Sequence, residues 1–143
     1  DGDHAVAADF YNRALEQAPE NIELLTDAGF ACYLRKEYTA AEPLLVAALD
    51  QQPKHERAAN NLGLVLGMQG RMTEALAAFE RVQSRASAFK NLSVVYQQQG
   101  YWAEAVTCYE RAQQLDSQVV IPAKLLAKAK ESQQAARSNE LKT

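Results

Sequence analysis

Residues 69–81 read QGRMTEALAAFER, and residues 99–111 repeat the same pattern as QGYWAEAVTCYER. Each stretch has a Gly, an apolar residue two positions later, a Glu-Ala pair, and an aromatic residue four positions after the Ala. Weaker copies occur at residues 37–45 and 2–11. The anchoring alanines are Ala7, Ala41, Ala75 and Ala105, and the last interval between them is four positions shorter than the two equal intervals before it. A nearly fixed internal period of this length predicts repeated supersecondary units that stack on one another.

Apolar residues recur with helical periodicity along most of the chain, and Pro and Gly interrupt them. The breaks fall at Pro19, Pro53, Gly70 and Gly100, residue types that end or follow helices. No segment shows the strict alternation of a strand. The sequence therefore predicts eight helices joined by short turns, at residues 3–18, 21–35, 40–51, 54–69, 73–84, 86–99, 103–115 and 119–136.

The repeat resembles the tetratricopeptide repeat, a helix–turn–helix unit of about 34 residues. In the first, half-length repeat the matching residues are Ala7, Tyr11, Ala14 and Pro19. In the second they are Leu25, Ala28, Gly29, Cys32, Ala41, Leu45, Ala48 and Pro53. In the third they are Ala59, Leu62, Gly63, Leu66, Ala75, Phe79 and Val82. In the fourth they are Phe89, Leu92, Ser93, Tyr96, Ala105, Tyr109 and Ala112.

This resemblance implies an all-α, right-handed α-solenoid of antiparallel helix pairs, with about three and a half repeats and a capping helix. We expect a single domain at residues 1–136 and a frayed tail at 137–143. The expected parts are repeats at 1–21, 22–55, 56–85 and 86–118 and a capping helix at 119–136, whose apolar face is Ala123, Leu126 and Ala127.

Two departures from a regular array have structural consequences. The first repeat lacks its first helix, so one face of the helix at 3–18 has no partner in the sequence. We expect either native sequence before Asp1 or a second copy of the chain, forming a homodimer, to cover that face. The shorter interval falls between the third and fourth repeats, so about one helical turn is missing near Arg85. The helix that starts near Thr73 should therefore end early.

An Asn-Leu motif precedes and follows this short connection, in residues 60–63 (NNLG) and 90–93 (KNLS). The combination is similar to the lipoproteins that assemble tight-adherence (Flp-type) pili. That likeness implies a periplasmic partner protein in pilus or secretion assembly; without it, the expected compartment is the cytoplasm.

The sequence contains no recognisable catalytic, phosphate-binding or metal-binding motif. We interpret His4 and His55 as surface histidines, and Cys32 and Cys108 as small apolar residues buried on repeat positions. We therefore predict no enzyme activity, no catalytic residue, no cofactor and no metal. The net charge of −3 argues against a nucleic-acid partner. No apolar run reaches the roughly 18 residues of a membrane span.

The resemblance also implies a binding groove, because the first helix of each repeat lines the concave face in this family. A strip of apolar and polar side chains there would suit an extended peptide or an amphipathic helix. The groove residues that follow from the repeat register are Thr26, Phe30, Tyr33, Asn60, Leu64, Met68, Lys90, Val94 and Gln97, with Lys124 added from the capping helix. The alternative for some of them, including Phe30 and Leu64, is that they simply pack between neighbouring helices.

Two functions remain open at this stage. The first is a non-enzymatic protein–protein interaction scaffold that binds a protein or peptide partner in the groove. The second is a structural spacer or self-association segment of a larger protein, with no groove ligand.

Overall fold

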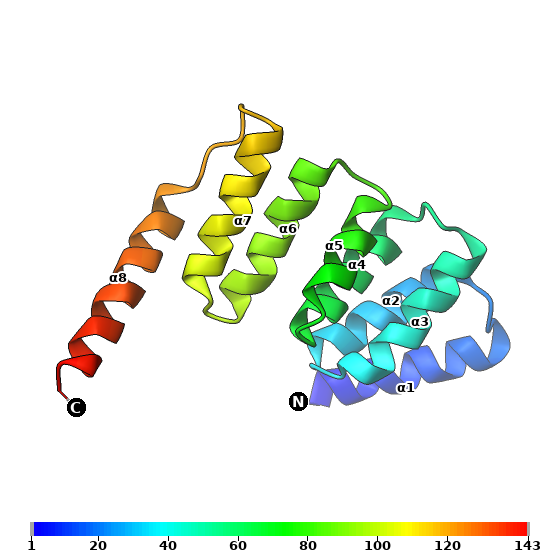
Figure 1. Ribbon diagram of the computed structural model, residues 1–143. Coiled ribbons are helices and arrows are strands. Elements are labelled where there is room, and N and C mark those ends of the chain that lie inside the picture. The colour runs from blue at the N-terminus through cyan, green and yellow to red at the C-terminus, as the bar shows by residue number, and fades with distance from the viewer. Residues whose placement is uncertain (1, 143) are drawn as a thin grey trace. The chain divides into compact units, whose positions relative to one another are not determined.

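The computed structural model describes residues 2–142, and within that range it contains eight α-helices and no strand (Figure 1). This confirms the predicted all-α class and its α-solenoid architecture of antiparallel helix pairs. The helices are α1 (Gly2–Gln17), α2 (Ile22–Leu34), α3 (Tyr38–Gln51), α4 (Glu56–Met68), α5 (Met72–Glu80), α6 (Arg85–Gln98), α7 (Trp102–Leu115) and α8 (Ala123–Glu140).

The helices form two compact units, one that ends at Gln83 and one that begins at Ser84. In the first unit, α2 packs against α1, α3 and α4, while α4 also packs against α3 and α5. In the second unit, α7 packs between α6 and α8. The boundary coincides with the shortened interval between the third and fourth repeats.

The shortened interval between the third and fourth repeats corresponds to a shorter α5. This helix has 9 residues, whereas α3 and α7, at the equivalent place in their repeats, have 14 each. It ends at Glu80, whereas the apolar pattern alone predicted a span as far as Ser84. Early termination, as expected from the spacing, is therefore confirmed. Ser84 then starts the next helix, because its Oγ accepts a hydrogen bond of 3.2 Å from the backbone N–H of Ser87.

The turn between the two helices of each complete repeat has the same geometry. One residue in each turn adopts a positive φ: Lys36 at 62°, Gly70 at 79° and Gly100 at 78°. The following N–H reaches back to a carbonyl five residues earlier, as in the bond of 2.9 Å from Glu37 to Cys32. Gly tolerates this conformation without steric cost, whereas Lys36 does not. The second repeat nevertheless keeps the same turn, with Lys36 in the place of the glycine.

The two helices of a repeat approach closely where the first helix carries a small residue. A Cβ added to Gly29 would lie 2.6 Å from a side-chain carbon of Leu45, and one added to Gly63 would lie 2.3 Å from a ring carbon of Phe79. In the fourth repeat, Ser93 occupies this position and its Oγ donates a hydrogen bond of 2.9 Å to the carbonyl of Ala105. Each complete repeat thus brings its helices together at one crowded point.

Two local sequence interpretations are wrong. The inward residues of α8 are Leu125 and Ala129, while Leu126 is exposed. The helix starts after Pro122, later than the expected start at 119, and continues to Glu140, beyond the expected end at 136.

We predict that Gly63→Ala destabilises the protein by about 1–3 kcal/mol, because the new methyl group overlaps the Phe79 ring. At an uncrowded helical position the same change would stabilise by up to about 1 kcal/mol, so the sign is diagnostic. Urea denaturation of both proteins measures the difference. An unfolding free energy above that of the wild type would contradict the close approach.

Candidate functional site

The aligned faces of α2 and α4 form the best-defined exposed surface of the first unit. Arg57 Nη1 of α4 lies 2.9 Å from Glu23 Oε2 of α2, and Arg57 Nη2 also bonds Asp27. Glu23 and Arg57 are 34 residues apart and occupy the same position in successive repeats. Their contact means that α2 and α4 present the same face side by side, so later residues in the two helices should follow in matching pairs.

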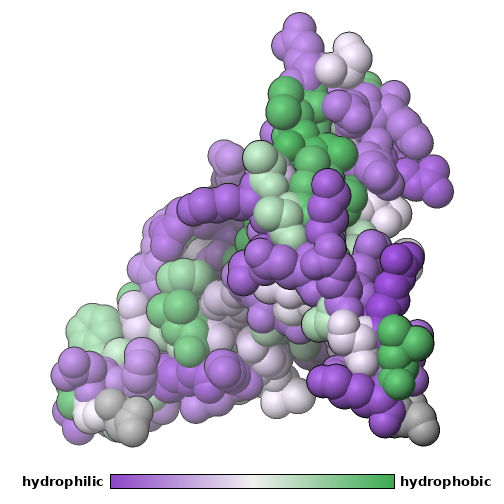
Figure 2. Space-filling view, turned by 90° about the vertical axis from the view of Figure 1, so that its left-hand side faces the viewer, coloured by the Kyte–Doolittle hydropathy of each residue, from purple (hydrophilic) through white to green (hydrophobic). Residues whose placement is uncertain are grey.

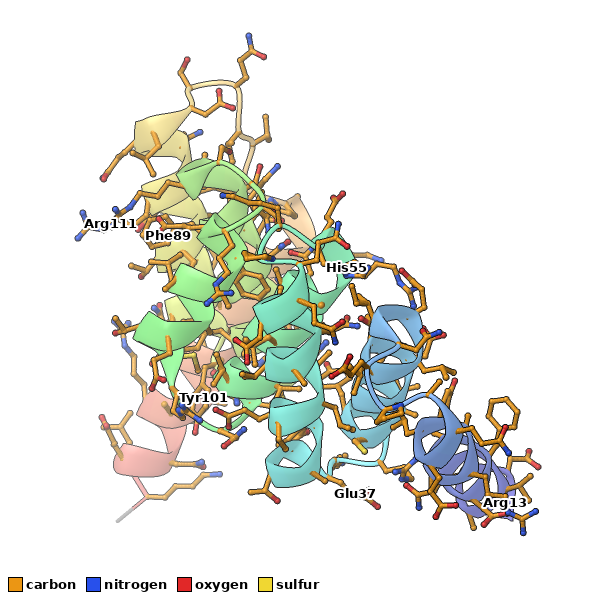
Figure 3. All side chains as sticks on the ribbon, turned by 90° about the vertical axis from the view of Figure 1, so that its right-hand side faces the viewer. Arg13, Glu37, His55, Phe89, Tyr101 and Arg111 are labelled. Carbon is orange, nitrogen blue, oxygen red and sulfur yellow. The ribbon has the colours of Figure 1, made fainter. Side chains whose placement is uncertain are left out.

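The charged end of this α2–α4 face is anchored by His55, which precedes α4 (Figure 3). Its Nδ1 accepts a hydrogen bond of 3.2 Å from the backbone N–H of Ala58, and its Nε2 lies 3.0 Å from Glu23 Oε1. Because Nδ1 accepts, the ring proton is on Nε2 and is donated to the carboxylate. The His55 side chain is only 11% exposed, so its interpretation as a surface histidine was wrong.

These contacts shift the ionisation of the charged groups. The hydrogen bond from His55 is the main reason that the pKa of Glu23 is lowered, with Arg57 adding to the effect. The hydrogen bond to Asp27 raises the pKa of Arg57. The Glu23 carboxylate and the Arg57 guanidinium therefore face each other as charged groups at neutral pH, at the N-terminal ends of α2 and α4.

The other end of the α2–α4 face is aromatic and apolar. Phe30 is 37% exposed and stacks on Tyr33 with ring centroids 5.8 Å apart, and Tyr33 lies 6.0 Å from Tyr38. Leu34, one turn beyond Phe30, is 53% exposed. The helical repeat puts Glu23, Phe30 and Leu34 on one stripe, since Phe30 follows Glu23 by two turns and Leu34 follows it by three.

The corresponding stripe on α4 is Arg57, Leu64 and Met68, each at the position of its α2 counterpart in the next repeat. Leu64 and Met68 are both half-buried. The apolar end is thus built from two neighbouring helices, and the charged end is separated from it by about two helical turns, or roughly 10 Å.

Not every residue expected in the groove reaches this surface. Thr26 is fully buried and its hydroxyl donates a hydrogen bond of 2.8 Å to the carbonyl of Ile22, so it offers no surface to a ligand. Asn60 is half-buried, and its Oδ1 accepts a hydrogen bond of 2.9 Å from Gln83. Phe30, Tyr33, Leu64 and Met68 remain accessible in whole or in part.

The other four expected residues belong to the second unit. On α6, Val94 is exposed, Lys90 is half-buried, and Gln97 donates a hydrogen bond of 3.2 Å to Ser93 Oγ. Lys124 is exposed on α8. These four residues lie in the second unit and are not part of the α2–α4 face.

The second unit also has an apolar surface that the sequence reading did not single out. Leu115, at the end of α7, and Val120, in the connection to α8, are 54% and 78% exposed. Figure 2 views the α8 side and shows apolar surface gathered near the top, at the level of this connection in Figure 1. Neither residue is on a groove position of the repeat.

Sequence reasoning missed Leu34, Glu23, Asp27 and Arg57 on the α2–α4 face. Leu34 could have been found from the repeat register. It occupies the same position as Met68, one repeat earlier, and Met68 was already an expected groove residue. The ion pairs were harder to find, because opposite charges in two different repeats become neighbours only when those repeats stack.

Within residues 2–142, no group of three or more His, Cys, Asp or Glu side chains is arranged to hold a metal ion. None of the described helices combines the length and apolar character needed to cross a bilayer. Cys32 and Cys108 are free and buried, as interpreted from the sequence.

Comparisons with known proteins agree with this geometry. Two family models, both described as tetratricopeptide repeat, match residues 33–91 and 86–118. The chain belongs to the tetratricopeptide repeat family. Members of this family typically serve as non-enzymatic scaffolds for protein–protein interaction, and this chain has the architecture of such a scaffold. No curated protein sequence matches the chain.

Several solved tetratricopeptide repeat structures are similar to the chain. A MamA structure described as MSR-1 is 25% identical, with a TM-score of 0.62 over 83% of this chain and 71% of its own. A second, described as AMB-1, is 25% identical, with a TM-score of 0.59 over 77% and 68%. YrrB, described as a TPR protein with an unusual peptide-binding site, is 24% identical, with a TM-score of 0.64 over 90% and 66%. The chain spans about two-thirds of the length of these neighbours.

We predict that His55→Ala lowers the unfolding free energy by about 1 kcal/mol, because the first turn of α4 loses its side-chain cap. His55→Asn should lose less, since an Asn oxygen can accept the same backbone N–H. Thermal and urea denaturation measure both changes. His4→Ala is the matched control, because His4 is exposed on α1 and should have no effect. Equal stability of the His55→Ala and His4→Ala variants would show that the cap contributes nothing.

We predict that neither thiol reacts appreciably with an aromatic disulfide reagent in the native protein at pH 8. Burial raises the pKa of Cys108 to about 11 and also raises that of Cys32, and the thiolate is the reactive form. In guanidinium chloride both thiols should react at once. Rapid native-state labelling of two thiols, followed by absorbance, would contradict the burial of these residues.

Proposed function

We propose that this chain is an interaction scaffold that binds an apolar or amphipathic peptide segment on the α2–α4 face. The observation that carries the proposal is the exposure of Phe30 and Leu34 at the apolar end of a face shared by two helices. Exposed apolar side chains that cluster in this way commonly mark interaction sites.

The composition of the face favours a peptide over a small molecule. Phe30, Leu34, Leu64 and Met68 offer contact area along the surface, while the Arg57 ion pairs lie about two turns away. Burying one large apolar side chain contributes about 1.5–3 kcal/mol, so two anchors from a ligand would support measurable binding. The Met side chain adapts its shape to different partners.

The polar groups at the charged end of the α2–α4 face would orient a bound peptide. The exposed carboxylates of Glu23 and Asp27, each bonded to Arg57, could also accept hydrogen bonds from a ligand, because a carboxylate has more acceptor sites than one guanidinium fills.

YrrB shares the fold and is described as having an unusual peptide-binding site. That description belongs to YrrB, and it motivates linear peptides as the probe for this chain.

The finer sequence-based assignments remain predictions. Lys90, Val94, Gln97 and Lys124 would provide binding surface in the second unit, where the lysines favour a ligand with an acidic end. The role in pilus or secretion assembly, and the periplasmic location that it implies, rest only on the Asn-Leu likeness.

The second candidate function is a self-association or spacer segment with no peptide ligand. It is favoured by one specific observation, the uncovered apolar side of α1, where Val6 and Phe10 are both exposed. Substitutions on the α2–α4 face distinguish the two candidates. They should abolish the binding of a peptide only if the chain is a peptide-binding scaffold.

The test is selection of a phage-displayed library of linear peptides on the immobilised protein. We predict that selected peptides are rich in apolar residues and that Phe30→Ala with Leu34→Ala weakens their binding about tenfold or more, as loss of central anchors does. Fluorescence anisotropy with a selected, labelled peptide measures the affinity.

The matched control is the double variant Leu115→Ala with Val120→Ala, which also removes two exposed apolar side chains but from the second unit. It should bind selected peptides like the wild type. Circular dichroism establishes that both double variants are folded. Peptides that bind the folded Phe30→Ala/Leu34→Ala variant as tightly as the wild type would refute the proposed face, and a library that yields no binder would favour the spacer reading.

A further inference from the structure

The first helix has an apolar side that no other described element covers. Val6 is 71% exposed and Phe10 is 61% exposed, and none of the residues of α1 is fully buried. A shallow depression of about 380 Å³ lies along this side, formed only by α1 residues, namely Val6, Asp9, Phe10, Arg13, Ala14 and Gln17. The opposite side of α1, which includes Ala7 and Tyr11, is half-buried where the helix packs on α2.

The internal repeats provide a comparison for Phe10. It lies three positions after the anchoring Ala7, and its counterparts at the same position in α3, α5 and α7 are Leu44, Ala78 and Cys108. Leu44 is half-buried, and Ala78 and Cys108 are buried. A large aromatic residue is therefore exposed in α1 at a position that is wholly or partly covered in the other repeats.

Val6 departs from the other repeats in its residue type. Its counterparts, one position before each anchoring alanine, are Ala40, Glu74 and Glu104, and all of them are exposed. Three repeats thus place a small or charged residue at this solvent-facing position, whereas α1 places Val there. The apolar stripe on α1 is not a by-product of the repeat pattern.

Two opposite charges flank Phe10 on this side. Asp9 Oδ2 and Arg13 Nε form an ion pair of 3.1 Å along the helix, with both side chains mostly exposed. Figure 3 shows Arg13 on the side of α1 that faces away from α2. An exposed pair of this kind contributes little to stability, so its partners can be exchanged at small cost.

The arrangement is self-complementary. If two copies of α1 pair antiparallel about a two-fold axis near Tyr11, Asp9 of each copy lies opposite Arg13 of the other. The two Phe10 side chains then meet close to the axis, and Val6 of each copy lies near Gln17 of the other. One face thus supplies both the apolar contact and the matching charges that a symmetric pair requires.

We propose that the outer side of α1 is a self-association surface, on which a second copy of this chain binds through antiparallel α1–α1 packing. This proposal rests on the self-association candidate described above and names its contact surface, and it does not depend on peptide binding by the α2–α4 face. The second copy is the occupant because the face carries one acidic and one basic group placed symmetrically about its apolar centre. A purely acidic or purely basic partner would match only one of the two.

The test uses sedimentation equilibrium of the full chain over a range of concentrations. The wild type should show reversible dimerisation. Asp9→Arg leaves two cations at positions 9 and 13, and Arg13→Asp leaves two anions, so each variant alone should dimerise at least tenfold more weakly. An equimolar mixture of the two should recover the dimer, because each copy then faces the opposite charge. Phe10→Ala should weaken dimerisation in every background.

Arg111→Asp is the matched control, because Arg111 occupies the repeat position of Arg13 on α7 and is exposed. It should dimerise like the wild type, and circular dichroism establishes that all the variants are folded. Any of three results would overturn the proposal: a wild type that stays monomeric at every concentration, single variants that dimerise like the wild type, or a mixture that stays monomeric. None of these results bears on peptide binding by the α2–α4 face.

Discussion

The close approach of the two helices within a repeat is the contact on which the rest of the structure depends. Gly29 faces Leu45, and Gly63 faces Phe79, at distances that leave no space for a Cβ. Because the small residue lets the partner side chain reach the first helix, the large residue becomes fully buried, and the remaining faces of both helices are free to meet neighbouring repeats. In the fourth repeat the hydroxyl of Ser93 serves the same close contact by donating to a backbone carbonyl.

Stacking of repeats then decides which residues meet across a distance in sequence. Where the repeats keep their full spacing, α2 and α4 present equivalent positions to each other, and the ion pair of Glu23 with Arg57 follows from that register. Where the spacing is shorter, α5 loses its last turn and the chain divides into two compact units at that connection. The α2–α4 face is therefore a property of the regular spacing, and it lies wholly within the first unit.

The sequence predicted most of the fold, because each helix carries its own apolar periodicity and its own stop signal. It was less successful on the surface. Thr26 was expected in the groove but is buried, since α2 is contacted by α1, α3 and α4 and few of its positions remain exposed. His55 was interpreted as a surface residue but caps α4, and the inward face of α8 was misjudged by one position. The burial of Thr26 and the inward face of α8 depend on neighbouring helices, whereas the His55 cap is a local contact supplemented by Glu23 of α2.

The sequence by itself determined the helix order, the repeat register, the small residues at the helix crossings and the early end of α5. These features depend on residues that are close together in the chain or separated by a fixed period, so local physical chemistry is sufficient to read them. The tertiary structure alone decided which groove positions are accessible, which charges pair between α2 and α4, and which side of α1 no described element covers. Those properties depend on how helices stack, because exposure and ion pairing are set by neighbours that are distant in the chain.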